Sequence, residues 1–206
     1  MRRFLLLPLL ALSSCAFATV NVTPPKAPQS TGLTGGKQRA VQLVVPLADA
    51  RAQPNRCGMQ KNGYNMDTAN VVCSVAPASW LAESLATELR TAGFTVLPSA
   101  PTGATALRLE GKLLQFFVEP KVGFLTFTPE ADIHIRLVAS SPSGLLAERD
   151  FYVKGEETSL VGAESNFQSA SDGATRQILG DMVRAVIELM DRYPELGTLQ
   201  VTTPAS

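Results

Sequence analysis

The most reactive side chains of this chain are those of three cysteines, Cys15, Cys57 and Cys73. Cys15 follows a basic start at residues 2–3 and a hydrophobic stretch over residues 4–12. A membrane-spanning helix needs about 20 apolar residues, and this stretch is much shorter. A short hydrophobic segment behind basic residues is typical of a secretory signal peptide. We therefore predict that the chain is exported.

The residues around Cys15, Leu12-Ser13-Ser14-Cys15, resemble the lipoprotein box of bacterial export signals. The resemblance implies that residues 1–14 are removed as a signal peptide and that Cys15 is acylated. Several acyl chains anchor a protein firmly, because each buried methylene contributes about 0.8 kcal/mol. Ala16, a residue other than aspartate after the cysteine, implies sorting to the outer membrane. The alternative is a plain secreted protein in which Cys15 is incidental.

Cys57 and Cys73 flank a segment rich in Asn and Gly. Since exported proteins fold in an oxidising compartment, we predict a disulfide between these two residues. Two free thiols are the alternative. A metal site is disfavoured, because His134 is the only histidine and no cysteine pair has CxxC spacing. We expect neither a metal nor a cofactor.

Composition divides the remaining chain into a tether and one domain. Residues 15–38 are rich in Thr, Pro, Gly and Ser and lack a hydrophobic period, which predicts a flexible tether. We predict a folded domain over residues 39–196, long enough for a hydrophobic core, and a disordered tail over 197–206. The full chain has 18 basic and 18 acidic residues. Removal of Arg2 and Arg3 with the signal peptide leaves 16 basic residues against 18 acidic ones. This balance argues against a nucleic-acid partner.

Hydrophobic patterning predicts an α+β domain. A buried strand is expected within residues 40–51, a helix over 79–94 and a short strand over 94–99. Long alternating segments at 105–120, 127–140 and 145–157 predict an antiparallel meander. A second helix is expected over 171–196. Together they predict a mixed, mostly antiparallel sheet of about five strands, with both helices packed on one face.

Polar residues on these strands do not define a reaction. His134 shares the solvent-side face of its predicted strand with Asp132 and Arg136, and the pattern supplies no positioned partner for acid–base catalysis. Glu110, Glu119 and Glu130 are also best explained as charges on exposed strand faces. We therefore expect no catalytic residues and no enzyme activity. A periplasmic hydrolase built on His134 is the least favoured hypothesis.

Six other residues are candidates for contact with a partner or ligand. Asp49 and Arg51 follow the first predicted strand, where a surface ion pair or a turn is the simpler interpretation. Four phenylalanines gather around one predicted hairpin bend: Phe116, Phe117, Phe124 and Phe127. Alternation sends Phe116 and Phe117 to opposite faces, so at least one aromatic is expected to be exposed. Coverage by the second helix or by the other chain of a dimer is the alternative.

The order of the expected elements resembles the YajG-type family of bacterial outer-membrane lipoproteins over roughly residues 1–196. The resemblance is carried by "VVPLADAR", "LRTAGF", "ALRLEGKLLQF", "RDFYVKGEE" and the helix "ILGDMVRAVIELMDRYPEL". It implies a lipid-anchored periplasmic α+β domain without a known catalytic site.

We therefore expect a non-enzymatic module for interaction or envelope assembly, held at the periplasmic side of the outer membrane by acyl chains on Cys15. Its partner would be an envelope protein or a second copy of the chain. The alternative is an auxiliary lipoprotein of an ABC-type export system for lipids or solutes, which binds an apolar ligand. Copurified lipid would favour this alternative.

Overall fold

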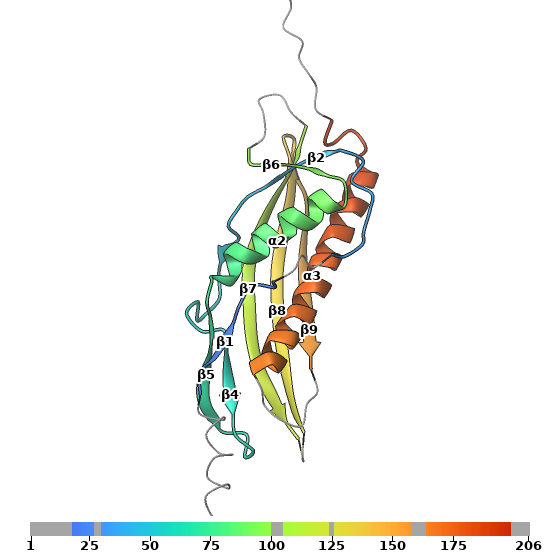
Figure 1. The fold of residues 1–206 in the computed structure, drawn as a ribbon. Helices are drawn as coiled ribbons and strands as arrows, with labels where there is room; N and C mark the ends of the chain where they lie inside the picture. Colours follow the sequence, from blue (N-terminus) through green and yellow to red (C-terminus); the bar gives the residue numbers. More distant parts are fainter. Residues whose placement is uncertain (1–17, 27–29, 100–104, 124–125, 158–163, 199–206) are drawn as a thin grey trace, which may run out of the picture.

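The computed structural model describes residues 18–26, 30–99, 105–123, 126–157 and 164–198. These residues form one mixed sheet of nine strands and two helices, α2 and α3 (Figure 1). The predicted α+β class with two helices is confirmed, whereas the predicted number of about five strands is wrong. The predicted signal peptide, Cys15 and residues 199–206 of the predicted tail lie outside the described residues.

Three long strands form the largest part of the sheet, with β9 at its edge. β7 (Leu107–Val122), β8 (Phe127–Ser141) and β9 (Gly144–Glu156) pair in antiparallel order, as the alternating segments predicted. Because alternate side chains point to opposite faces, Leu109, Ile133 and Phe151 are buried on one face, and polar residues occupy the other. We call this second, polar face the open face.

Short strands continue the sheet along the other edge of β7. β2 (Ala40–Leu43), β3 (Ala48–Asp49) and β4 (Gly58–Lys61) each pair with β7 in parallel, one after another along its length. β6 (Thr95–Leu97) pairs with β2, and β5 (Asp67–Cys73) forms an antiparallel hairpin with β4. The strand count exceeds the prediction for three reasons. The single strand expected at 40–51 is two strands, the cysteine-flanked loop is a two-stranded hairpin, and residues 20–22 of the predicted tether form one more strand.

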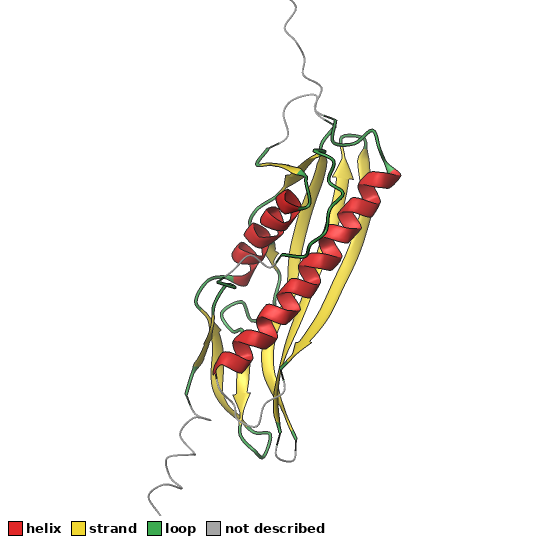
Figure 2. Ribbon diagram, turned by 45° about the vertical axis from the view of Figure 1, so that its right-hand side comes forward, coloured by secondary structure: helices red, strands yellow, loops and turns green. Residues whose placement is uncertain are grey.

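Both helices cover the face of the sheet opposite the open face (Figure 2). α2 (Pro77–Thr91) buries its leucine stripe and sets Trp80 against Phe116, with ring centroids 5.6 Å apart. α3 (Glu164–Arg192) begins before the predicted residue 171, since its first turns bury Phe167 and Ala170. The predicted packing of two helices on one face is thus found.

Most of the segment predicted as a flexible tether is folded onto the domain. Its residues Val20–Val22 form β1, which pairs in parallel with β5 and buries both valines. The Thr31 amide donates a hydrogen bond of 2.9 Å to a carboxylate oxygen of Glu88, a buried residue of α2. The tether prediction is therefore wrong for the described residues 18–26 and 30–38. A three-residue strand is too short to stand out in a polar composition.

Candidate functional site

Asp49, which is exposed, and Arg51, which is buried, form an ion-paired clasp at the end of β3. The Arg51 guanidinium meets the Asp49 carboxylate at two points, with Nε–Oδ1 2.9 Å and Nη2–Oδ2 2.8 Å. Arg51 is 8% exposed and also donates to the carbonyl oxygens of Pro54 and Arg56. The hydrogen bond from Arg51 lowers the pKa of Asp49. This clasp holds the loop between β3 and β4 in place.

A recess lies between this loop and β7. Leu114 is the extra residue of a β-bulge in β7, where the pairing with β8 shifts between Leu113 and Gln115. The recess has a volume of about 340 Å³, and its lining includes Arg51, Arg56, Gln115 and Phe117. The Arg56 guanidinium lies 5.6 Å from the centre of the Phe117 ring, a cation–π geometry. We call this hollow the bulge recess.

The bulge recess brings together residues that the sequence singled out separately. Arg51 belongs to the pair Asp49 and Arg51 that follows the first predicted strand, and Phe117 belongs to the predicted aromatic hairpin. Arg56 was not a candidate, because no local pattern shows that a loop arginine reaches an aromatic ring on a distant strand. Gln115 was missed because its position beside the recess depends on the bulge.

The phenylalanines separate as alternation predicted. Phe116 is fully buried beneath α2, and Phe117 lies partly exposed at the bulge recess. Phe127 packs on Phe167 of α3, with ring centroids 5.9 Å apart. α3 thus covers part of the predicted aromatic cluster, which was the alternative interpretation. Phe124 lies outside the described residues.

The open face carries rows of ion pairs across its strands. Glu119 meets Lys61 at 2.7 Å, and Glu130 meets Lys154 at 3.0 Å. Burial by itself raises the pKa of Glu130, but the hydrogen bonds from Lys154 and Lys121 outweigh it and lower that pKa. Both carboxylates pair with lysines across the strands, as the interpretation of a charged strand face expected.

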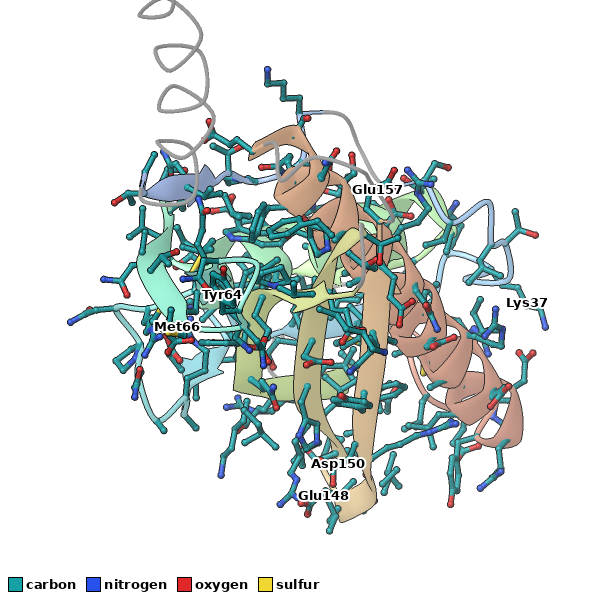
Figure 3. The ribbon with its side chains drawn as sticks, turned by 90° about the horizontal axis from the view of Figure 1, so that it is seen from below. Lys37, Tyr64, Met66, Glu148, Asp150 and Glu157 are labelled. Atoms are coloured by element: carbon teal, nitrogen blue, oxygen red, sulfur yellow. A yellow bond between two sulfur atoms is a disulfide. The ribbon has the colours of Figure 1, made fainter. Side chains whose placement is uncertain are left out.

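His134 belongs to the same network. Its Nε2 lies 3.3 Å from Oδ1 of Asp150, and Arg136 binds the same carboxylate through Nε and Nη2, both at 2.9 Å. The hydrogen bond from Arg136 lowers the pKa of Asp150. Figure 3 shows Asp150 and Glu148 on β9, directed away from α3. The arrangement stabilises the pairing of β8 with β9.

The predicted disulfide between Cys57 and Cys73 is present. It joins the residue before β4 to the last residue of β5, so it closes the β4–β5 hairpin at its base. A crosslink over a loop of this size stabilises a fold by roughly 3 kcal/mol in the chain-entropy model.

A second recess lies between α3 and the upper parts of β8 and β9. It has a volume of about 220 Å³ and a mainly apolar lining that includes Leu137, Phe151 and Leu189. Arg149 and Arg192 also line it. We call it the helix–sheet pocket. Glu148 and Glu188 line it as well, so the charged residues at its edge balance, and its mainly apolar lining suits an apolar group.

Two features are absent from the described residues. No cluster of three or more His, Cys, Asp or Glu in this part of the chain is placed to hold a metal ion. Among the same residues, no helix is both long and apolar enough to span a membrane.

Comparisons with known proteins identify the class of fold. No protein-family model and no curated protein matches the chain. A solved structure from Xanthomonas campestris, described as belonging to the family DUF330, has a TM-score of 0.57 at 15% identity and covers 86% of this chain and 96% of its own. The chain therefore shares its α+β fold with that bacterial protein.

Two further solved structures are less similar. The hypothetical protein CT253 from Chlamydia trachomatis has a TM-score of 0.43 at 10% identity and covers 73% of this chain and 96% of its own. The lipoprotein GNA1162 from Neisseria meningitidis has a TM-score of 0.32 at 16% identity and covers 75% of this chain and 99% of its own. The resemblance to YajG-type lipoproteins stays a prediction.

Proposed function

We propose that the chain is a lipid-anchored, non-catalytic protein of the bacterial envelope that binds a partner protein at the bulge recess and the adjoining open face. The observation that carries this proposal is the convergence on one recess of Arg51 and Arg56, from the loop after β3, with Phe117 of β7. Arginine and aromatic residues are enriched at the energetic centres of protein interfaces.

The surroundings of the recess suit such an interface. Phe117 pairs across the sheet with Asp132, and Gln115 pairs with His134. Polar and charged residues of the open face therefore adjoin the aromatic recess, as the polar rim of an interface surrounds its core. Because Arg51 is fixed by the clasp, a partner would meet a preorganised recess.

The location rests on the N-terminal sequence. The lipoprotein-box residues 12–15 support acylation of Cys15, and Ala16 supports sorting to the periplasmic side of the outer membrane. The Cys15→Ala variant is expected to move from the membrane fraction to the aqueous periplasmic fraction. If it stays with the membrane, the anchor lies elsewhere in the protein.

Photo-crosslinking in intact cells tests the recess. A benzophenone amino acid replaces Gln115 beside the recess or, as a matched control, Gln177 on the exposed side of α3. We expect a discrete crosslinked species from position 115 alone, and its loss when Phe117→Ser is added. A species that contains two copies of this chain would make the partner a homo-oligomer. Equal crosslinking at the two positions would contradict the proposal.

The helix–sheet pocket favours a second candidate function, the binding of an apolar ligand within a lipid or solute export system. Its mainly apolar lining carries this alternative. Lipid that copurifies with the Cys15→Ala protein, and that is lost when Ala185→Trp fills the pocket, would support it. Lipid retained by Ala185→Trp would place the ligand elsewhere.

A further inference from the structure

The turn between β4 and β5 presents two large hydrophobic side chains to solvent. Tyr64 is 86% exposed and Met66 is 57% exposed, although most apolar side chains of this size are buried. Figure 3 views the molecule from this end and labels both residues. Neither side chain packs on the hydrophobic core, so the fold itself does not explain them.

Asn62 holds this turn in a defined shape. Its side-chain oxygen accepts hydrogen bonds from the amides of Tyr64, at 3.0 Å, and Met66, at 3.1 Å. The Asn62 amide donates to the Met66 carbonyl oxygen, and Asn65 adopts a left-handed conformation with φ of 61°. The turn is therefore built to project Tyr64 and Met66 outward.

The start of the described chain lies close to this turn. The Ala18 carbonyl oxygen accepts a hydrogen bond of 2.7 Å from the side chain of Gln60 in β4. Val20 pairs with Val71, and Gln60 pairs with Ala69, so Ala18 lies at the level of Gln60 on the sheet. β1 runs parallel to β5, away from the turn, and both strands lie at the same end of the molecule (Figure 1).

Chain lengths then relate the turn to the predicted anchor. Three residue steps separate Cys15 from Ala18, which allows at most about 11 Å of extended chain. Tyr64 lies four positions beyond Gln60, or about 13 Å at the rise of a strand. A bilayer that holds acyl chains on Cys15 is therefore within reach of Tyr64 whenever the sheet stands upright on it.

We propose that the β4–β5 turn is a membrane-contact site, in which Tyr64 and Met66 enter the lipid interface beside the acylated N-terminus. This inference rests on the lipid anchor of the proposed function. Tyrosine suits this position because its ring is apolar and its hydroxyl can stay in the headgroup layer. The contact fixes the domain upright, with its β8–β9 turn farthest from the membrane.

Site-specific fluorescence on the full-length lipidated protein tests this contact. Met66→Cys and the control Leu145→Cys are labelled with an NBD fluorophore and reconstituted into vesicles of phosphatidylethanolamine and phosphatidylglycerol. Leu145 is matched to Met66, because it is 65% exposed and lies beside the β8–β9 turn, at the opposite end of the sheet. Cys57 and Cys73 are paired, so the new thiol is the labelling site.

The expected result is a blue shift at position 66 and at least threefold stronger quenching by acyl-chain nitroxide lipids than at position 145. If the protein floats with the vesicles but position 66 is as exposed to water as position 145, the membrane-contact site is wrong while the lipid anchor stands. Protein that does not float would overturn the anchor and this inference together. If the fluorophore at position 66 is shielded from water only when envelope proteins are added, the turn contacts a protein and the lipid site is wrong.

Discussion

At the scale of single residues, Arg51 is the side chain on which the candidate site depends most. It is a buried cation that satisfies the Asp49 carboxylate and two backbone carbonyl groups at once. It also lies 3.6 Å from the sulfur of Cys57, so the clasp and the disulfide fasten neighbouring parts of one loop. The shape of the bulge recess therefore depends on this residue.

Replacement of Arg51 with methionine should lower the free energy of unfolding by about 2–3 kcal/mol, because Asp49 and the carbonyl groups lose a charged partner. Arg108→Met is the matched control. Its ion pair with Glu110 is exposed, and exposed pairs contribute about 1 kcal/mol or less. Urea unfolding at neutral pH measures both variants. Equal losses would mean that Arg51 is no more than a surface charge.

The stability of the Arg51→Met variant should also depend on pH differently from that of the wild type. Because Arg51 lowers the pKa of Asp49 below its ordinary value of 3.8, this pair stabilises the fold above that pH. The contribution is lost as pH falls toward the lower pKa of the folded state. The difference in unfolding free energy between wild type and Arg51→Met should therefore shrink below about pH 4. A constant difference down to acid pH would contradict a charged clasp.

At the scale of elements, the packing of α3 on β9 depends on a close approach at Gly155. A Cβ atom there would overlap the Ala170 carbonyl oxygen and lie 2.7 Å from the Ala174 amide nitrogen. Both are backbone atoms of the helix, which cannot rotate away as a side chain could. Gly155 thus sets the distance between the helix and the sheet beneath it.

Gly155→Ala should destabilise the protein by about 1–3 kcal/mol, because α3 must shift outward along β9. Gly173→Ala in α3 is the control, and it is expected to change the free energy of unfolding in the opposite direction. A Cβ at residue 173 meets open space, and alanine in place of a helical glycine stabilises by about 0.5–1 kcal/mol. Thermal unfolding of both variants and of the wild type measures these changes in stability. A neutral Gly155→Ala would show that the helix can move freely on the sheet.

Sequence patterns predicted the elements in which periodicity is long. The alternation in β7, β8 and β9 and the leucine stripe of α2 each extend over enough residues to give a clear period. β1 and β4 were missed because strands of three or four residues show too few alternations, and β5 was missed because only Val71 of its seven residues is buried. Their burial depends on tertiary partners that no local pattern contains.

The candidate site was predictable only in part, for a related reason. Alternation correctly separated Phe116 from Phe117, since the strand period acts locally. The meeting of Arg56 with Phe117 depends on the path of a loop and on a bulge. The exposure of Tyr64 and Met66 depends on the turn that Asn62 builds, which is visible only in three dimensions.

At the scale of the whole molecule, the first described residues determine how the domain can stand relative to an anchor. Because β1 is part of the sheet, few residues separate Cys15 from the folded domain. The long axis of the sheet runs from the β4–β5 turn toward the β8–β9 turn (Figure 1). A short connection at one end of this axis restrains the orientation of the open face at the membrane.

A flexible insertion should abolish this restraint without changing the fold. About 20 Gly and Ser residues placed between Phe17 and Ala18 give a connection with a mean span of about 25 Å, more than the turn needs to leave the bilayer. Flotation with vesicles and urea stability should match those of wild type, because the anchor and β1 are intact. Lipid quenching at position 66 should fall at least twofold toward the value at position 145, since local concentration no longer favours the contact. Unchanged quenching would mean that Tyr64 and Met66 bind lipid strongly enough without the short connection, and that the spacing of the anchor does not orient the domain.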